Sequence, residues 1–251
     1  MNRPRLAITG LTGCSGCQLT LLNSESDLPL LMERFAFAAF PLAGIPLQPD
    51  GRYDVALVEG CCSTPHEEKL LRELRRRSLL LIALGSCAAW GGVPASCNPT
   101  PRSRLQGLVH GGAGQRGAEY LPRPVGRVVK VDATLPGCPP EPVELLRFLG
   151  DIQRGVPPLA TTAPVCSECR MLENRCLLSE GGVLCLGPVT LGGCGARCPA
   201  RGVACEGCRG PAPEANLAEL DRLCRDHRFD RQTVEAALRR FCGEWDDERR
   251  A

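Results

Sequence analysis

The sequence predicts an α/β protein with a doubly wound parallel sheet over residues 1–155, a cysteine-rich and mostly irregular segment over 156–210, and a short helical C-terminal tail over 211–251. Two observations predict the sheet: short apolar runs end in glycine-containing loops, and stretches of helical composition separate them. A third observation is that eight of the 17 cysteines lie between Cys166 and Cys208. This density indicates a region that inorganic ligands hold together.

The candidate strands are apolar runs of similar length: Arg5–Gly10, Tyr53–Gly60, Leu79–Leu84 and Val128–Val131. The third run is unbroken, as is typical of strands buried on both faces of a sheet. Residues 17–28 and His66–Arg77 have helical composition and alternate with these runs, so we expect the sheet to be parallel. In the tail, apolar residues at helical spacing around Leu220 and Val234 predict two further helices.

Composition excludes several classes of function. Hydrophobic residues make up 43% of the chain, enough for a core, and the net charge of +2 is too balanced to indicate a nucleic-acid or membrane-surface partner. No run of 18 apolar residues predicts a transmembrane helix, and the N-terminus lacks the apolar stretch of a signal peptide. We therefore expect a cytoplasmic protein, in which abundant cysteine indicates metal sites rather than disulfides.

Four cysteines follow the predicted strands. Cys14 and Cys17 lie in the loop GCSGC, Cys87 follows the third run, and Cys138 lies in PGCPP. Because the carboxyl ends of parallel strands border one crevice, these thiols are expected to converge there. Taken singly, each loop also fits a simpler role. The first could be a phosphate loop, although no Gly-Lys-Ser/Thr follows, or a redox-active CxxC; Cys87 could be an ordinary buried thiol, and PGCPP a plain proline turn.

The remaining dense cysteines form two quartets in sequence: Cys166, Cys169, Cys176 and Cys185, then Cys194, Cys198, Cys205 and Cys208. Crowded thiolates repel one another unless cations neutralise them, and this glycine-rich segment has few large apolar side chains with which to form a core. Iron–sulfur clusters meet both needs. Zinc held by pairs of CxxC is the alternative, and it would make the segment purely structural.

Three further features lie near the expected crevice or outside it. Glu59 ends a buried strand and is either a hydrogen-bonded structural carboxylate or a group that handles protons or tunes a cluster. The pair Cys61-Cys62 lies in the same crevice and could supply an alternative ligand. The basic run Arg72–Arg77 indicates a solvated helix face or a docking patch. The other cysteines are expected to be ordinary buried thiols: Cys97, Cys224 and Cys242.

Five stretches together resemble the small subunit of [NiFe] hydrogenases, with the greatest likeness to the cytoplasmic sulfhydrogenase delta subunits of the NAD(P)-linked group. They are TGCSGCQL, VEGCCST, GSCAAWGGV, VDATLPGCPPE and the cysteine-rich stretch from residue 165 to 210. The resemblance covers most of the chain and implies a flavodoxin-like domain with a proximal [4Fe–4S] cluster on Cys14, Cys17, Cys87 and Cys138. It implies a distal cluster on Cys166, Cys169, Cys176 and Cys185, and a medial cluster on Cys194, Cys198, Cys205 and Cys208.

Two positions set this chain apart from periplasmic relatives. Those proteins have histidine at the position of Cys166 and often proline near Cys198, so cysteine at both positions implies two four-iron clusters. The tandem Cys61-Cys62 departs from the family, where small residues are usual, and is similar to the double cysteine of the related complex I subunit.

The resemblance implies an electron-transfer subunit of a hydrogen:NAD(P)+ oxidoreductase that is not catalytic alone. The nickel–iron site would lie on a large subunit, and FAD and NAD(P) would bind a further flavin- and NAD(P)-binding subunit. A ferredoxin-like iron–sulfur subunit would be another partner. The carboxyl-end crevice would be a permanent interface with the large subunit. The alternative is a hydrogenase-like relay whose large-subunit partner lacks nickel, as in the complex I relatives.

Overall fold

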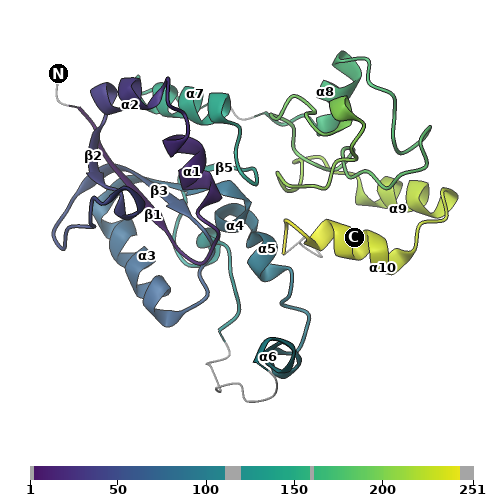
Figure 1. Cartoon of the computed structure of the whole chain (residues 1–251), viewed down its shortest axis with the longest axis horizontal. Helices are drawn as coiled ribbons and strands as arrows, with labels where there is room; N and C mark the ends of the chain where they lie inside the picture. Colours follow the sequence, from purple (N-terminus) through teal and green to yellow (C-terminus); the bar gives the residue numbers. More distant parts are fainter. Residues whose placement is uncertain (1–2, 111–119, 159–160, 244–251) are drawn as a thin grey trace.

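The structure is a computed structural model that describes residues 3–110, 120–158 and 161–243. Figure 1 shows an α/β part and, beside it, a second part that contains the helices α8, α9 and α10. No helix in these described ranges is both long and apolar enough to cross a membrane.

A five-stranded sheet forms the centre of the α/β part. Its strands are β1 (Arg5–Gly10), β2 (Ala36–Ala39), β3 (Tyr53–Glu59), β4 (Ser78–Leu84) and β5 (Ala133–Leu135). They pair in the order β2-β1-β3-β4-β5, and all pairs are parallel. This is the strand order of flavodoxin-like doubly wound sheets, so the predicted fold class is confirmed.

Helices cover both faces of the sheet because alternate side chains of the central strands point to opposite faces. On one face, Ile8 and Leu57 pack with Leu21, Phe148 and Leu149 of α1 (Gly16–Leu22) and α7 (Pro142–Gln153). The helix α2 (Leu28–Arg34) contributes Leu31 to the same core.

On the other face, Ala56 and Val58 pack with Leu71 and Leu74 of α3 (Pro65–Arg77). The remaining elements of this part are shorter or more peripheral: α4 (Gly85–Trp90), α5 (Gly92–Ala95), α6 (Arg102–His110), η1 (Pro41–Ala43) and η2 (Val125–Arg127). Strands buried on both sides explain the unbroken apolar runs in the sequence.

The last predicted strand is wrong. Residues 128–131 follow η2 and form no strand, and β5 begins only at Ala133, opposite Ile82. The reason lies at Asp132, whose carboxylate accepts a hydrogen bond from Leu81 N (2.8 Å) while its own N–H donates to Leu81 O (2.9 Å). The carboxylate of Asp132 accepts the N–H that a backbone carbonyl would accept in a longer strand. The pairing of β5 with β4 therefore begins only at Ala133. Of the residues 17–28, which have helical composition, only the first half and the last residue are helical, because α1 ends at Leu22 and α2 begins at Leu28.

The second part has little regular structure around its cysteines. Between α8 (Val165–Met171) and α9 (Leu217–Asp226), the structure contains one short helix, η3 (Pro199–Arg201). The tail helices α9 and α10 (Arg231–Arg239) begin with side-chain caps, in which Asn216 and Asp230 accept backbone N–H groups at 2.9 Å. Their buried Leu220 and Leu238 share one core with thiols of the cysteine-rich segment.

Candidate metal centres

The first group of thiols lies at the carboxyl edge of the sheet, next to the point where the strand order reverses between β1 and β3. Its members act on one another's ionisation: Cys14, Cys17, Cys87 and Cys138. Burial, and then the charges of Cys87 and Cys14, raise the pKa of the Cys138 thiol to about 11. These four cysteines follow β1, β4 and β5 at the carboxyl edge of the sheet, and their convergence on one ligand site stays a prediction.

Glycines lie directly against these sulfurs. A Cβ atom on Gly92 would lie 2.6 Å from the Sγ of Cys87, and one on Gly85 would overlap the Sγ of Cys17. Both glycines have positive φ, 54° and 82° respectively, which L side chains rarely adopt. The backbone can therefore come close to whatever these sulfurs bind, as amide donors do around clusters.

Glu59 ends the strand β3 and is 3% exposed. Its carboxylate accepts hydrogen bonds from Cys17 N (3.0 Å), Gln18 N (3.2 Å) and Gln18 Nε2 (2.8 Å). The two backbone groups belong to the first turn of α1, where N–H groups have no partner within the helix. After burial, Glu59 is also the next largest cause of the raised pKa of Cys17. The hydrogen bonds to α1 support the structural interpretation of Glu59, and its effect on the pKa of Cys17 supports the tuning interpretation.

The structure separates the two members of the Cys61-Cys62 pair. Cys61 is fully buried, and burial followed by the charge of Cys87 raises its pKa to about 12. Cys62 points the other way, with its Sγ 3.8 Å from Thr64 O and 3.7 Å from Tyr120 Oη. Cys61 is thus a fifth thiol beside the first group, while Cys62 belongs to a network under α3.

The second group lies in the segment between α8 and α9, and its members are Cys194, Cys198, Cys205 and Cys208. Burial raises the pKa of Cys208 to about 11, with further increases from Cys194 and Cys198. Backbone N–H groups of Arg197 and Ala196 donate to the Cys194 thiol and oppose the effect of burial there. Amide donors of this kind surround ligated sulfurs in iron–sulfur proteins.

The third group comprises Cys166, Cys169, Cys176 and Cys185. Burial, and then the charges of the other three members, raise the pKa of Cys166 to about 12. Cys176 is the exposed member of the group. Burial acts to raise its pKa, but hydrogen bonds from Ser179, including its N–H at 3.4 Å, outweigh burial and leave the pKa lowered.

Two contacts join the three groups into a series. The backbone N–H of Cys138 donates to the Cys208 thiol, and the charges of these two thiols also interact. The N–H of Cys205 donates to the Sγ of Cys185 at 3.2 Å. The first group therefore touches the second, and the second touches the third.

Some residues at these groups were not predicted from the sequence. Glu168, on α8 between two cysteines of the third group, accepts N–H groups of Gly193 (2.7 Å) and Ala196 (3.1 Å) from the second group. Arg209 and Ser86 lie between the first and second groups. A polar residue adjacent to a predicted ligand is the signal that all three share, but sequence alone does not say what it contacts.

The donor sets fit iron–sulfur clusters in their chemistry. Each group offers four thiols, and thiolate is the ligand type of iron–sulfur clusters and of zinc. In the part of the chain that the structure describes, no set of three or more His, Cys, Asp or Glu side chains is placed to hold one metal ion. Amide donors and glycines packed against the sulfurs are features expected around a cluster.

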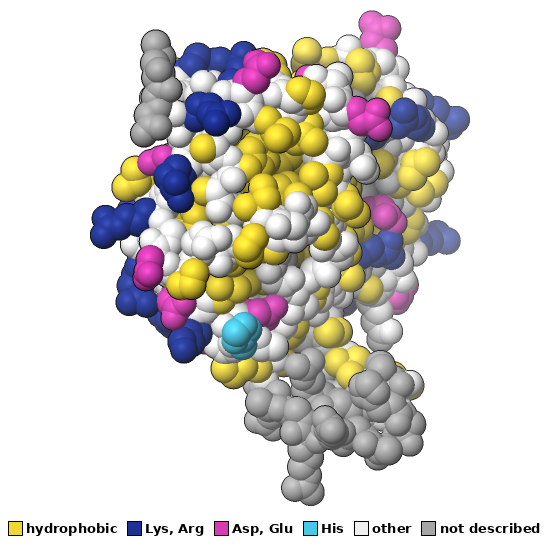
Figure 2. All heavy atoms as spheres, turned by 60° about the vertical axis from the view of Figure 1, so that its left-hand side comes forward, with side chains coloured by type: hydrophobic (Ala, Val, Ile, Leu, Met, Phe, Trp, Pro, Cys, Tyr) yellow, Lys and Arg dark blue, Asp and Glu magenta, His cyan; other side chains and the backbone are white. Residues whose placement is uncertain are grey.

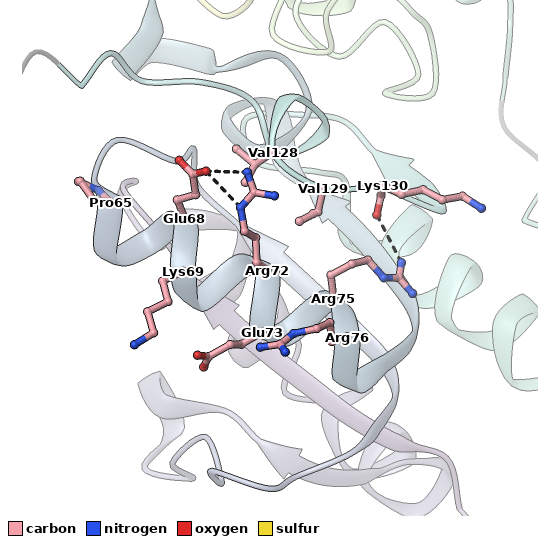
Figure 3. Close-up of a pocket in the computed structure, with 10 residues that line it drawn as sticks. All are labelled: Pro65, Glu68, Lys69, Arg72, Glu73, Arg75, Arg76, Val128, Val129 and Lys130. Carbon is pink, nitrogen blue, oxygen red and sulfur yellow. Dashed lines mark hydrogen bonds and ion pairs between the residues drawn. The ribbon is translucent and has the colours of Figure 1, made fainter.

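The basic helix α3 borders a separate groove of about 730 Å³. In Figure 3, Arg72 lies beside Glu68 and Arg75 points to the carbonyl of Lys130. Arg75 also forms an ion pair with Asp132. Two of the four arginines of this run, Arg72 and Arg75, are thus in ion pairs on a solvated helix face, which favours the simpler of the two interpretations made from the sequence.

Apolar side chains gather on one face of the molecule. Figure 2 shows them as a band down the middle of this face, with charged side chains around it. Large apolar residues exposed on α1, α2 and η1 include Leu19, Leu30, Met32 and Leu42. Contiguous exposed apolar surface of this kind marks interaction sites.

Similar sequences occur in known redox proteins. Residues 14–152 match the family of the NADH ubiquinone oxidoreductase 20 Kd subunit. The sulfhydrogenase 2 subunit delta of Pyrococcus furiosus is 38% identical over 88% of this chain and 92% of its own length. An F420-non-reducing hydrogenase subunit of Methanocaldococcus jannaschii is 34% identical over 82% of this chain and 81% of its own length.

Solved structures give the same result. A chain of an NAD+-reducing [NiFe]-hydrogenase in the H2-reduced state superposes with a TM-score of 0.57 at 31% identity, and covers 63% of this chain and 95% of its own. A chain of the [NiFeSe] hydrogenase of Desulfovibrio vulgaris Hildenborough is 18% identical with a TM-score of 0.53, over 85% of this chain and 95% of its own, and shows a shared fold.

These matches define the class of the protein first: the chain belongs to the NADH ubiquinone oxidoreductase 20 Kd subunit family. Within that family it is a small subunit of the [NiFe] hydrogenase type, an electron-transfer component of an oxidoreductase. The resemblance inferred from the sequence motifs is confirmed.

Proposed function

We propose that this small subunit relays electrons between the nickel–iron site of a large subunit and a flavin- and NAD(P)-linked partner through three [4Fe–4S] clusters. The proximal cluster would be held by the group of Cys14, Cys17, Cys87 and Cys138. The medial cluster would be held by Cys194, Cys198, Cys205 and Cys208, and the distal one by Cys166, Cys169, Cys176 and Cys185. The observations that carry the proposal are two contacts between members of successive groups, from Cys138 N to the Cys208 thiol and from Cys205 N to the Cys185 thiol.

When bound, each cluster would supply a site that takes up and releases one electron. The residues of this chain would bind the clusters, donate hydrogen bonds to them and exclude water. The thiolates would hold the iron, and amides that donate to sulfurs, such as Cys205 N to Cys185 Sγ, would stabilise their negative charge. The apolar cores on both sides keep water away from Cys17, Cys185 and Cys205, which are each at most 8% exposed. Hydrogen bonding and burial of this kind set reduction potentials.

The partner assignment rests on the relatives. The matched structure is that of an NAD+-reducing [NiFe]-hydrogenase, and the HoxS subunit delta of an NAD-reducing hydrogenase from Cupriavidus necator is 32% identical over 61% of this chain. We therefore propose a [NiFe] large subunit, a flavin- and NAD(P)-binding subunit and a ferredoxin-like iron–sulfur subunit as partners. The apolar band in Figure 2 supports a large permanent interface. The 17 cysteines, proposed mostly as metal ligands rather than disulfide partners, favour the cytoplasm.

A second candidate function follows from the matched family, which takes its description from an NADH ubiquinone oxidoreductase subunit. In this alternative, the large subunit lacks nickel and the chain serves other redox chemistry. The nickel ligands would lie on the large subunit, so the sequence of that partner decides. Two CxxC pairs there favour the hydrogenase, and their loss favours the alternative.

The proposal is tested by metal and sulfide analysis of the anaerobically purified complex. We expect about twelve irons and matching sulfide on this chain, from three four-iron clusters. About two zincs without sulfide would contradict it. Cys138→Ser should remove the iron of the proximal group, whereas Cys224→Ser, the matched control in the core of the tail, should leave the iron content unchanged.

A further inference from the structure

Arg209 is the largest fully buried side chain of the described residues. It directly follows Cys208 of the medial group, and 2% of it is exposed. Removing a guanidinium cation from water is costly unless every donor is bonded and a counter-charge is present. The partners of Arg209 therefore indicate what this buried cation does for the protein.

Its donors reach segments that carry thiols of two different groups. Nε donates to Gly192 O at 2.6 Å, two residues before Cys194 of the medial group. Nη1 donates to Pro136 O at 3.1 Å, two residues before Cys138 of the proximal group. One side chain thus ties a medial loop to a proximal loop.

The counter-charge comes from Glu144 on α7. Its two carboxylate oxygens accept from Nη1 and Nη2 of Arg209, both at 2.7 Å, in the bidentate geometry that makes such pairs strong. A side chain at Gly193 would overlap the guanidinium, so this loop can pass Arg209 only as glycine. The pair is anchored to the sheet domain through α7, and Arg209 is anchored to the cysteine-rich segment through the backbone.

A second tie runs beside the first. The hydroxyl of Ser86, next to Cys87, donates to Cys208 O and accepts from Gly137 N at 3.2 Å. The indole Nε1 of Trp90 donates to Arg209 O at 3.2 Å. The junction between the two parts of the protein is therefore built from hydrogen bonds at the place where the Cys138 amide meets the Cys208 thiol.

We propose that Arg209, held by Glu144, is a positioning residue that fixes the proximal and medial clusters relative to each other, and that its charge makes the medial cluster easier to reduce. The inference rests on the proposed function, because it requires clusters at both groups. A cation near a cluster stabilises the added electron, and at a buried site solvent screens this effect weakly. The carboxylate of Glu144 acts in the opposite direction.

The test is the reduction potential of the medial cluster in the anaerobically purified complex, measured by redox titration with electron paramagnetic resonance. Arg209→Gln should lower the potential and Glu144→Gln should raise it. At a fixed potential we expect at least a tenfold change in the ratio of oxidised to reduced cluster for each, which is about 59 mV for one electron. A purely structural role would not move the two variants in opposite directions.

Arg197 supplies the matched control. It neighbours Cys198, another medial ligand, and pairs with Glu141 at 2.8 Å, but its side chain is 57% exposed. Solvent screens such a pair, so Arg197→Gln should change the ratio less than about twofold. Arg209→Lys keeps the charge but loses the bidentate pair. Its potential should stay near that of the wild type, while the magnetic coupling between proximal and medial clusters changes.

The outcomes separate the inference from the proposed function. If the wild-type complex lacks iron and sulfide, the proposed function fails. If it is fully loaded but Arg209→Gln and Glu144→Gln both leave the potential unchanged, or shift it in the same direction, the role of Arg209 is wrong and the proposed function stands. If Arg209→Gln loses iron, the potential of Glu144→Gln and the magnetic coupling in Arg209→Lys still test the role of Arg209.

Discussion

The two parts of this protein assemble their thiols in opposite ways. In the sheet domain, the proximal thiols come from loops far apart in sequence, from Cys14 to Cys138, and each loop follows a strand with an extensive apolar core. In the second part, eight thiols come from one segment that has little regular structure. Its core is small and includes thiols among its members, Cys185 and Cys205.

This difference indicates which thiols the fold can position in the absence of metal. The strands fix the ends of the proximal loops by backbone pairing, so the proximal thiols are placed by the fold. In the second part, two of the proposed ligands, Cys185 and Cys205, are themselves core residues. Without metal, Cys205 must stay protonated, because burial raises its pKa to about 12, and the loops are then linked by hydrogen bonds such as those that Glu168 accepts.

The largest expected effect follows from removing iron. In the chelated, anaerobic complex, amides of residues 165–208 should lose their protection against hydrogen exchange, while amides of β1, β3 and β4 should keep theirs. The physical reason is that metal-binding free energy is folding free energy where no preformed site exists. Hydrogen–deuterium exchange with mass spectrometry measures both regions in one experiment. Equal loss, or equal retention, in the two regions would remove the distinction.

A ligand substitution in each region sharpens the comparison. Cys185→Ser leaves a polar group in the core and removes a ligand, so we expect a loss of roughly 2 kcal/mol and a fall in Tm of about 4–8 °C. Although neighbouring groups partly desolvate its thiol, Cys138 is accessible to solvent, and Cys138→Ser should remove proximal iron with little change in Tm. Calorimetry and iron analysis of both variants check this. A larger fall for Cys138→Ser would show that the proximal cluster also holds the sheet domain together.

Glu59→Gln tests whether the proximal loops are placed without metal. The substitution replaces one of the two carboxylate oxygens, which together accept three N–H groups, by an NH2 donor that faces them, and this costs about 1–3 kcal/mol when buried. The loss should be the same in the metal-free and the loaded chain, because the contact lies within the sheet domain. Urea denaturation followed at the sheet domain measures it. A loss that occurs only in the loaded chain would assign Glu59 to the cluster rather than to the start of α1.

Sequence reasoning recovered the parts that local pattern determines. Apolar runs predicted β1, β3 and β4, and the strand ends predicted that Cys14, Cys87 and Cys138 would follow strands at one edge of the sheet. It misplaced the last strand because the side chain of Asp132 replaces a backbone rung, which no apolar pattern reveals. It could not place Arg209, whose partners Pro136, Glu144 and Gly192 are scattered along the chain. Contacts between parts of a protein have no local signal.

The smallest expected effect concerns Glu67, which joins two proximal loops. Its carboxylate accepts from Thr12 Oγ1 (2.8 Å) and Ser63 N (2.8 Å), and Thr64 caps its own N–H in return (3.1 Å). Burial acts to raise the pKa of Glu67, but these hydrogen bonds outweigh burial and leave it lowered. A carboxylate with a lowered pKa contributes stability above its unfolded pKa, and this contribution is lost as pH falls through the folded value.

Glu67→Gln should therefore destabilise the chain by about 1 kcal/mol at pH 7, as loss of a capping interaction does. Because both proteins carry a neutral side chain below the folded pKa of Glu67, their difference should shrink as the pH falls below about 4.3. Urea denaturation of the metal-free chain from about pH 3 to pH 7 measures this, with Glu73→Gln on the same helix as the control. If the difference in the free energy of unfolding between the two proteins did not depend on pH, the charge of Glu67 would not stabilise the two loops that it joins. The sheet domain would then place its thiols by strand pairing alone, and the contrast with the second part would be sharper still.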